Sequence, residues 1–338
     1  MRSPELFVGF CLLSLAILPL ASGCAGSRER AVHSTGPVTI SRMNFRGWRN
    51  SYRLTNGQVE LIVVPQIARI MKYSLVGGEN LLWVNDEMTP DATGQQFPPP
   101  DPKKWANFGG YKLWMAPEQE KGWPPDWQLD RGPCRAPYTG DGSLHLIGMA
   151  SQKHGIRFDR KITLAPHGTR VEIEQTMINV SKGPVSGAIW EVTQVKADCL
   201  AFVPMGPGAT YRVSKTEDLD DQWSRADDML LLRPSGKPNK VFISGPPGWL
   251  GCQRGEVLYL KSFDFPQEPT PETEAPREVY TSNLGYIELE VVAPAVTLEP
   301  GQRTTFNETW QLAPAVAAAT DRSLVASIRA RVEQLLQR

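Results

Sequence analysis

The chain has 338 residues, and its 36 lysines and arginines balance 36 aspartates and glutamates, so the formal net charge is zero. A neutral chain without a basic block is poorly suited to bind nucleic acid or an anionic membrane surface. Only four histidines and five widely spaced cysteines are present, so the sequence predicts no metal and no other cofactor.

Residues 1–23 predict a bacterial secretion signal. Arg2 supplies positive charge, and the apolar run Leu6–Leu20 is shorter than the ~20 residues that a membrane-spanning helix needs. The small residues before Cys24 resemble the lipobox of bacterial lipoproteins, which implies that Cys24 is lipidated and begins the mature protein. Ordinary signal cleavage that leaves a free Cys24 is the alternative. Because Ala25 rather than an aspartate follows, we expect the lipid to anchor the protein in the cell envelope, at the outer membrane, facing the periplasm or the exterior.

Residues 24–44 are mostly small and polar, which predicts a tether from the lipid to a single domain over residues 45–313. Most of that domain alternates apolar and polar residues, as strands do. The predicted strands are Tyr52–Val64 (a hairpin around Asn56 and Gly57), Ile70–Val84 (a pair around Gly77 and Gly78), Arg157–Leu164 with Arg170–Val180 (a hairpin), Val185–Val195, Val241–Ser244, Val257–Phe263, Tyr286–Val292 and Thr304–Leu312. Many short strands with Gly and Pro turns predict an all-β sandwich.

The C-terminal residues 319–338 predict the one clear helix. Apolar residues recur at helical spacing between Asp321 and Leu336, and Asp321 could cap the start. We expect this amphipathic helix to cover sheet surface.

Residues 85–142 interrupt the strand pattern and are rich in aromatic residues. Four of the ten tryptophans fall here, and charged or amide residues lie among the rings. The candidate ligand-binding residues of this region are Trp105, Asn107, Tyr111, Trp114, Trp123 and Trp127, with Lys112 and Asp126 as candidates for chemistry. Either the rings pack beneath the loop, or some of them line a cleft for a flat, partly apolar ligand such as a sugar. The mixture of rings and charges favours a carbohydrate.

Two later strands carry carboxylates that could act in acid–base chemistry. Strict alternation places Tyr286, Glu288 and Glu290 on one strand face, with the apolar residues between them facing the core. A pair of carboxylates at this spacing could supply a general acid or base, although a solvent-facing polar stripe has the same pattern. In Val185–Val195, Trp190 and Glu191 point to opposite faces.

Several segments resemble a known superfamily. The run GWRNSYRLTNGQVELIVVPQIARIMKYSLVGGENLLW resembles the opening of galactose-mutarotase-like (aldose 1-epimerase-like) proteins. The segments NFGGYKLWMAPEQEKGWPPDWQLDRGP, IWEVTQV, YIELEVVAPAVTLEPGQ and FNETWQL resemble, more narrowly, a branch of secreted bacterial proteins in that superfamily that has no assigned activity. The resemblance implies a β-supersandwich of two large antiparallel sheets with a sugar site on a concave face.

The resemblance also implies a catalytic pair. Aldose mutarotases open and reclose a sugar ring with a histidine as acid and a glutamate as base. The glutamate corresponds to the region of Glu288 and Glu290, whereas Trp190 or Glu191 stands where the histidine is expected. The candidate acids are therefore Glu191, Lys112 and Asp126, and His145 is a weaker alternative.

Two classes of function remain open from the sequence. The first is an enzyme acting at an anomeric carbon, with Glu288 or Glu290 as base. The second is an envelope lipoprotein that binds carbohydrate without catalysis or serves a structural role. The sequence leaves open a disulfide among Cys134, Cys199 and Cys252, and calcium binding by the acidic residues 217–221.

Overall fold

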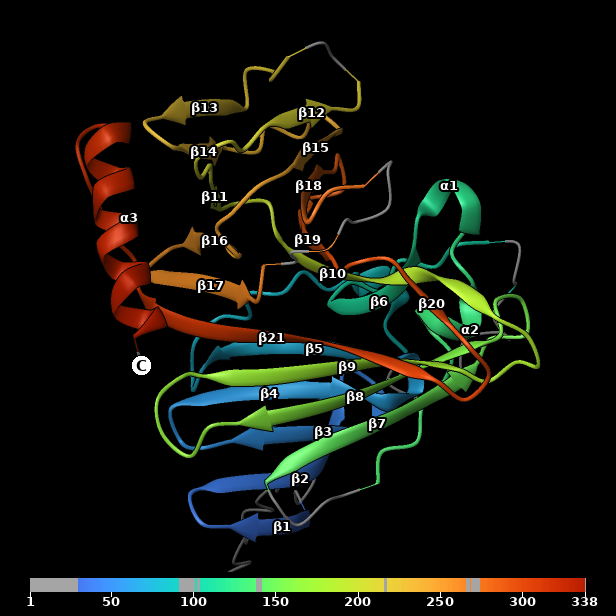
Figure 1. Cartoon of the computed structure of the whole chain (residues 1–338). Coiled ribbons are helices and arrows are strands. Elements are labelled where there is room, and N and C mark those ends of the chain that lie inside the picture. The colour runs from blue at the N-terminus through green and yellow to red at the C-terminus, as the bar shows by residue number, and fades with distance from the viewer. Residues whose placement is uncertain are drawn as a thin grey trace, which may run out of the picture.

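The computed structural model describes residues 30–90, 101, 104–137, 142–215, 218–265, 268 and 274–337. Two antiparallel sheets pack face to face, and a single long helix, α3, lies against one of them (Figure 1). The all-β sandwich expected from the strand pattern and from the resemblance is therefore confirmed. Across the described ranges, no helix is long and apolar enough to cross a membrane.

The larger sheet has 12 strands in the order β1-β2-β3-β4-β5-β6-β10-β19-β18-β15-β12, and β20 pairs separately with β10. Its strands are β1 (Arg30–Thr35), β2 (Val38–Phe45), β3 (Trp48–Thr55), β4 (Val59–Val64), β5 (Arg69–Leu75), β6 (Tyr111–Ala116), β10 (Val185–Lys196), β12 (Tyr211–Val213), β15 (Asn239–Ile243), β18 (Arg277–Thr281), β19 (Tyr286–Val292) and β20 (Val296–Leu298).

The smaller sheet has 9 strands in the order β13-β14-β11-β16-β17-β21-β9-β8-β7. These are β7 (Ser143–Ala150), β8 (Ile156–Leu164), β9 (Val171–Asn179), β11 (Leu200–Pro204), β13 (Trp223–Ala226), β14 (Met229–Leu232), β16 (Trp249–Arg254), β17 (Val257–Phe263) and β21 (Arg303–Pro314). The helices are η1 (Pro65–Ile67), η2 (Asp86–Met88), α1 (Glu118–Lys121), α2 (Trp127–Asp130) and α3 (Asp321–Leu336).

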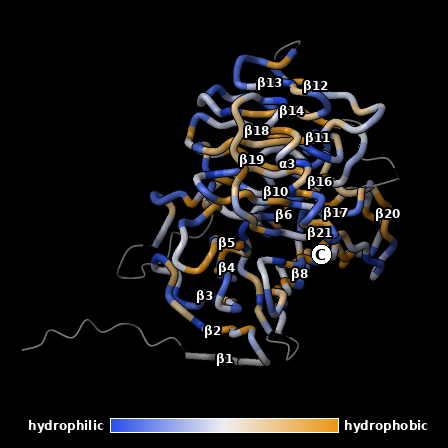
Figure 2. The backbone as a smooth tube through the Cα atoms, turned by 90° about the vertical axis from the view of Figure 1, so that its left-hand side faces the viewer, coloured by the Kyte–Doolittle hydropathy of each residue, from blue (hydrophilic) through white to orange (hydrophobic). Residues whose placement is uncertain are grey.

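Alternation along the strands builds the core between the sheets. Every second residue of β8 is buried, from Ile156 to Leu164, and the residues between them are partly exposed. Ile162 and Leu61, from opposite sheets, belong to one continuous cluster of buried side chains. Hydrophobic stretches run through the central strands, β18 and β19 among them (Figure 2).

Helix α3 covers the outer face of the smaller sheet, as its apolar stripe predicts. Ile328 and Val332 pack with Phe202, Leu231 and other residues of β11, β14, β16 and β17. The cap differs from the expectation. Thr320, rather than Asp321, accepts a hydrogen bond from the backbone N–H of Ser323 in a capping box.

Most predicted strands are present, but one predicted pair is wrong. Asn56 and Gly57 form the expected turn between β3 and β4, and the Asn56 side chain accepts hydrogen bonds from the backbone of Gln58 and Val59. After β5 the chain does turn at residues 75–78, where the Gly78 N–H donates to the Leu75 carbonyl and the Leu81 N–H donates to the Tyr73 carbonyl, but no second strand pairs with β5 there. Leu82 and Val84 instead form isolated bridges with β10 and the segment before β6.

Two predicted boundaries also need correction. The first sheet begins at β1 and β2, inside the range 24–44 predicted as a tether, because Val38 and Ile40 are apolar residues in alternation that the core buries. Residues 111–116, predicted as part of an aromatic loop, form β6 between β5 and β10.

An ion cluster lies within the core between the sheets. The Lys261 ammonium of β17 donates to both carboxylate oxygens of Glu191, each at 2.6 Å, and lies 3.8 Å from Glu308. All three side chains are fully buried. Burial, reinforced by the neighbouring carboxylate, raises the pKa of Glu191, and burial likewise raises the pKa of Glu308. Lys261 is therefore the cation that allows a carboxylate to be ionised in the core.

We expect the substitution Lys261→Met to lower the free energy of unfolding by about 3–5 kcal/mol, because it leaves a buried carboxylate without its cation. The loss should be smaller at pH 5 than at pH 8, since protonated Glu191 and Glu308 need no counter-ion. Urea denaturation at both pH values measures this. Lys182→Met, at an exposed position, is the control and should change stability by less than about 0.5 kcal/mol. An equal loss at both pH values would contradict the assigned role.

Candidate functional site

The candidate site lies on the outer face of the larger sheet, over β6, β10, β19, β18 and β15. The register pairs Trp190 with Trp114, Val192 with both Lys112 and Glu290, and Gln194 with Glu288. Side chains at paired positions share a face. The predicted alternation of β19 is confirmed, because Ile287 and Leu289 pack into the core whereas Glu288 and Glu290 lie on the opposite face.

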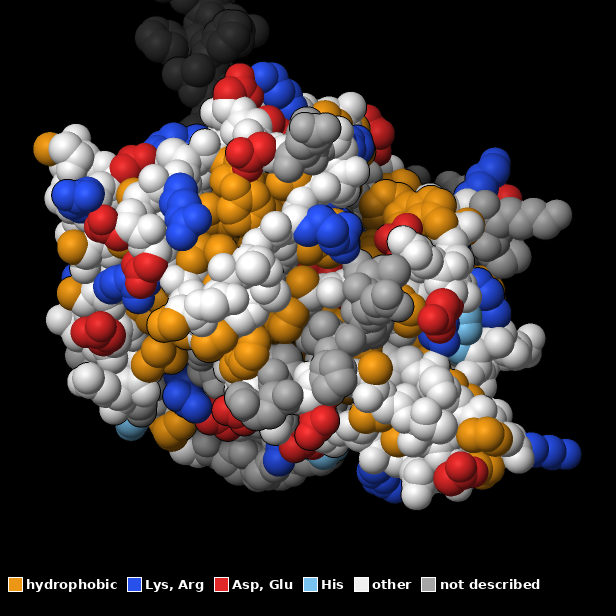
Figure 3. All heavy atoms as spheres, turned by 45° about the horizontal axis from the view of Figure 1, so that its top comes forward, with side chains coloured by type: hydrophobic (Ala, Val, Ile, Leu, Met, Phe, Trp, Pro, Cys, Tyr) orange, Lys and Arg blue, Asp and Glu red, His pale blue; other side chains and the backbone are white. Residues whose placement is uncertain are grey.

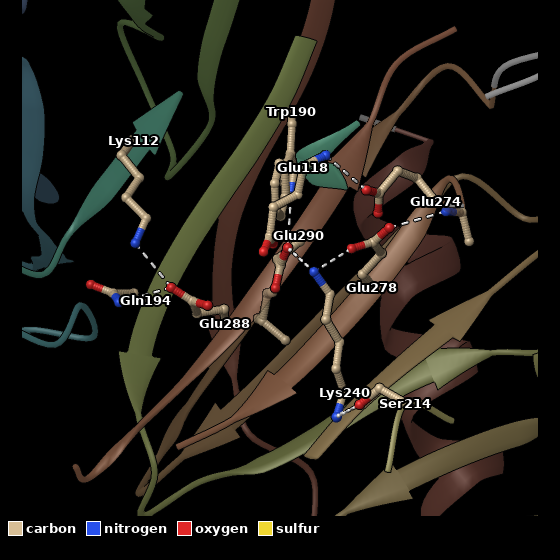
Figure 4. A network of polar contacts seen from close by, with 12 residues as sticks. Lys112, Glu118, Trp190, Gln194, Ser214, Lys240, Glu274, Glu278, Glu288 and Glu290 are labelled. Atoms are coloured by element: carbon tan, nitrogen blue, oxygen red, sulfur yellow. Dashed lines mark hydrogen bonds and ion pairs between the residues drawn. The ribbon is translucent and has the colours of Figure 1, made fainter. Parts of the chain in front are cut away.

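Glu288 is held by two donors. The Lys112 ammonium lies 2.9 Å from Glu288 Oε1, and the Gln194 amide donates to the same oxygen at 2.8 Å (Figure 4). The Lys112 side chain is fully buried, and burial lowers its pKa against the opposing effect of Glu288. At 8% side-chain exposure, Glu288 is the most accessible carboxylate of the β18–β19 group. These two donors fix the position of the Glu288 carboxylate on the outer face of the sheet.

Glu290 has a different environment, although it is only two residues away. Its Oε2 accepts hydrogen bonds from the Trp190 indole at 2.6 Å and from Lys240 at 3.1 Å. Its buried Oε1 has no hydrogen-bond partner within the described part of the chain. Burial, opposed by Lys240 and reinforced by Glu288, raises the pKa of Glu290 to about 7. This carboxyl group therefore exchanges a proton near neutral pH.

Lys240 joins Glu290 to a further carboxylate. Its ammonium lies 2.6 Å from Glu278 Oε2 and 4.5 Å from the centre of the Trp190 ring. Burial opposes the charge of Lys240, but Glu290 and Glu278 outweigh it and raise the lysine's pKa. Lys240 of β15 thus stays charged and pairs with a carboxylate on each of β18 and β19.

Aromatic rings surround the lysines on this face. Lys112 lies 4.1 Å from the Trp114 ring centre and 5.1 Å from that of Trp105. Trp105 and Trp123 meet edge to face at 5.1 Å, and Trp123 is 55% exposed. The Asp130 carboxylate of α2 accepts from the Trp114 indole and from Arg69 of β5, so it ties the loop to the sheet. On the face shown in Figure 3, hydrophobic side chains gather in patches among charged ones.

Tyr286 and Asn107 lie at the edge of this group. The Tyr286 ring packs against Trp83 at 4.6 Å between centroids, and burial raises the pKa of its hydroxyl. Asn107 is nearly buried, and its side-chain oxygen accepts from the backbone of Gly109. No group of three or more metal-ligating side chains occurs in the ranges that the structure describes.

The structure therefore brings many of the predicted site residues together. They are Lys112, Glu288, Glu290, Trp105, Trp114, Trp123, Trp190 and, at the edge, Tyr286 and Asn107. Asp126 lines a small cavity beside Trp114 and Trp190, but its carboxylate caps α2 and accepts from Ser151.

Other predicted residues lie elsewhere. Glu191 belongs to the Lys261 cluster in the core. Its side chain therefore lies on the core face of the sheet, whereas Glu290 of the neighbouring β19 lies on the outer face. Tyr111 is also buried in the core, where it contacts Trp310 and hydrogen-bonds to Gln175. Trp127 begins α2 and makes no ring contact with this aromatic group within the described residues. Cys24 lies outside the described ranges, as does Glu217 of the acidic loop.

The sequence reasoning missed Lys240, Glu278 and Trp83. Lys240 immediately precedes the predicted strand Val241–Ser244 and belongs to β15, in which Val241 and Ile243 face the core. Extending the alternation by one residue would have placed Lys240 on the outer face. Glu278 lies in β18, a short strand that was not predicted. The three cysteines in the described ranges are free, and His145 lies in β7 of the smaller sheet.

We expect Lys240→Met to raise the pKa of Glu290 above about 7, because the lysine favours the ionised carboxylate. Carboxyl NMR titration of glutamate-labelled protein measures the change. Lys72→Met is the matched control, since it removes a lysine paired with Glu60 on β4 of the same sheet and should leave Glu290 unchanged. A Glu290 pKa that stays constant or falls in Lys240→Met would refute the assigned effect.

Comparison with known proteins agrees with the fold. Residues 50–313 match a family model described as a domain of unknown function, DUF4380. No curated protein sequence matches the chain. Among solved structures, a galactose mutarotase-like protein from Lactobacillus casei superposes with a TM-score of 0.53 at 10% identity, covering 78% of this chain and 100% of that one.

Two further solved structures give the same result. A putative mutarotase from Salmonella typhimurium has a TM-score of 0.53 at 13% identity, over 85% of this chain and 97% of its own. A putative aldose 1-epimerase from Klebsiella pneumoniae has a TM-score of 0.52 at 10% identity, over 89% and 88%. At such identities the likeness concerns the fold. The chain belongs to the DUF4380 family, and its fold is that of galactose mutarotase-like proteins.

Proposed function

We propose that this protein binds a carbohydrate on the outer face of β6, β10 and β19 and catalyses acid–base exchange at the anomeric carbon of a reducing sugar. The mutarotase-like fold supports a carbohydrate ligand, since the solved structures of similar fold carry mutarotase and epimerase names. The observation that carries the catalytic part is the unequal environment of Glu288 and Glu290. Neighbouring carboxyl groups with different surroundings are the usual basis of acid and base assignments.

Glu290 is assigned as the general acid. Its Oε2 accepts two hydrogen bonds, so the proton of the neutral form belongs on the unpartnered Oε1. With a pKa of about 7, the group is substantially protonated at neutral pH and can still release the proton. Trp190, one of the two residues where the resemblance implies a histidine, donates to this carboxyl and holds it in place.

Glu288 is assigned as the general base. It removes the proton from the anomeric hydroxyl while Glu290 protonates the ring oxygen. The bond between the anomeric carbon and the ring oxygen breaks, and an open-chain aldehyde forms. Rotation about the adjacent carbon–carbon bond and reversal of both proton transfers close the ring as the other anomer. Lys112 and Gln194 orient Glu288 throughout.

Binding without catalysis is the second candidate. Both carboxylates are nearly buried and already paired with lysines, and buried ion pairs can serve structure alone. The exposed Trp123 would then supply a stacking surface for a sugar ring. A purely structural role would require its ring to be covered by another molecule.

Glu288→Gln and Glu290→Gln should each slow the exchange between α and β anomers by about a hundredfold or more, since each removes a proton carrier. NMR exchange spectroscopy on the full chain, with a panel of reducing sugars, measures the rate. The control is Glu174→Gln, at an exposed position of β9, which should retain full activity.

The pH dependence separates catalysis from binding. Because the acid form of Glu290 is needed, the wild-type rate should fall as pH rises through about 7. A wild-type protein that broadens sugar resonances without faster exchange would support binding alone. No effect on any sugar would refute the proposal.

We also propose that Cys24 is lipidated and anchors the protein in a bacterial envelope, at the outer membrane. The support is the charged, apolar and small-residue order of residues 1–24.

Wild-type protein expressed in bacteria should incorporate labelled fatty acid and remain with the membrane fraction, whereas Cys24→Ser should incorporate none. Cys134→Ser, a substitution at a cysteine within the folded domain, is the control and should be labelled normally. Labelling of Cys24→Ser would exclude this site.

A further inference from the structure

The chemical character of the ligand can be inferred from a small cavity beside the catalytic pair. Its volume is about 20 Å³, and its lining includes Trp114, Trp190 and other apolar residues together with two carboxylates, Glu118 and Asp126, and one lysine, Lys121. A space of this size holds about one water molecule, and a primary ammonium group has nearly the same size. The Trp190 indole forms part of the wall and also donates to Glu290, so this side chain connects the cavity to the acid–base pair, whose carboxylates do not themselves line it.

Carboxylates outnumber cations around this cavity. The backbone N–H of Glu118 donates to Glu274 at 3.2 Å, which brings the two residues together next to Glu278 and Lys240 (Figure 4). Burial, opposed by Lys240 and reinforced by Glu274 and Glu288, raises the pKa of Glu118, and burial, again opposed by Lys240, raises the pKa of Glu278. An added cation would stabilise both ionised groups.

The cationic groups near the cavity are already engaged. Lys121 donates to the backbone oxygen of Ser186, and Lys240 is paired with Glu278 and Glu290. His154, which also lines the cavity, has a pKa lowered by burial and by Lys153, so it is largely uncharged at neutral pH. Of the two carboxylates that line the cavity, Asp126 already accepts hydrogen bonds from Gln128 and Ser151. Glu118 is therefore the lining carboxylate that can meet a charge on the ligand.

The tryptophans of the wall suit an ammonium group as well. This face already places Lys112 over Trp114 at 4.1 Å and Lys240 over Trp190 at 4.5 Å. Aromatic faces attract cations and are common in sites that recognise ammonium groups. A phosphate or an additional carboxylate on the ligand would instead meet Glu118 and Glu274.

We propose that the sugar bound by this protein is an amino sugar, whose protonated amine enters the cavity between Trp114 and Trp190 beside Glu118. This inference rests on the proposed function, because it concerns the ligand of the same site. It adds that the site distinguishes sugars by charge, with the amine as the favoured substituent and acidic groups excluded.

Titration calorimetry on the full chain tests the charge preference. The ligands are glucosamine, galactosamine and mannosamine, each with its parent hexose and its N-acetyl derivative, at neutral pH, where the amine is largely protonated. We expect at least one amino sugar to bind about tenfold more tightly than its parent hexose. The uncharged N-acetyl derivative should show no such gain, and glucose 6-phosphate should bind more weakly than glucose.

A matched pair of variants on α1 locates the effect. Glu118→Gln should abolish the preference for the amino sugar while the parent hexose binds as before. Glu120→Gln changes a side chain that is 70% exposed on the same helix, and should retain the preference. Thermal unfolding of both variants verifies that they fold, and the ligand series on the wild type tests the inference independently.

The outcomes separate this inference from the proposed function. Equal affinity for amino sugars and parent hexoses would overturn the inference alone, as would tighter binding of glucose 6-phosphate. A preference retained in Glu118→Gln would overturn the assigned cavity. If no sugar binds, the proposed function fails and the inference fails with it.

Discussion

The register between β10 and β19 determines which charges meet at the site. Val192 pairs with Glu290 and Gln194 with Glu288, so both carboxylates face the same side of the sheet as Trp190. A shift of one residue would turn both glutamates toward the core and bring apolar side chains to the site. The apolar residues between the glutamates prevent that shift, because the core between the sheets holds them. The geometry of the site is therefore fixed by packing on the other face of the same strand.

Charges are buried on both faces of β10, and each has a specific partner. Glu191 meets Lys261 in the core, whereas on the outer face Lys112 meets Glu288. Desolvation of such pairs offsets much of their mutual attraction, so they are a poor source of net stability. Their contribution on the outer face is better understood as preorganisation, since the donors around Glu288 are in place before a ligand arrives. The core pair is fully buried, and we expect its removal to affect stability.

The sequence predicted the faces of strands better than their partners. Alternation in Tyr286–Val292 placed Glu288 and Glu290 together correctly. It could not choose between the two faces of β10, because a central strand covered on both sides has buried residues at nearly every position. Glu191 was therefore a reasonable candidate that tertiary packing assigned to the core. Lys240 meets Glu290 only because β15 lies two strands from β19, and such a long-range arrangement has no local sequence signal.

The aromatic region shows a similar limit. Its rings divide between the core and the outer face according to their position on β6, where Tyr111 points inward and Trp114 outward. Composition left two interpretations open, packing beneath the loop and a ligand cleft. The burial of Tyr111 and Trp114 agrees with packing, whereas a ligand cleft stays a prediction. Gly109 and Gly110 precede β6 and Pro117 follows it. These turn-forming residues make the short alternation of β6 hard to recognise as a strand in the sequence.

The tryptophan at position 190 explains how the catalytic roles can be distributed without the histidine that the resemblance implies. An indole N–H donates a hydrogen bond but cannot exchange its proton at ordinary pH. Trp190 can therefore hold Glu290 but cannot replace a histidine as the acid. In the proposed mechanism the proton comes from Glu290, whose pKa burial raises to about 7. Under the proposed function, the same tryptophan orients the acid and forms a wall of the cavity that selects the ligand, so sugar recognition and proton transfer depend on one side chain.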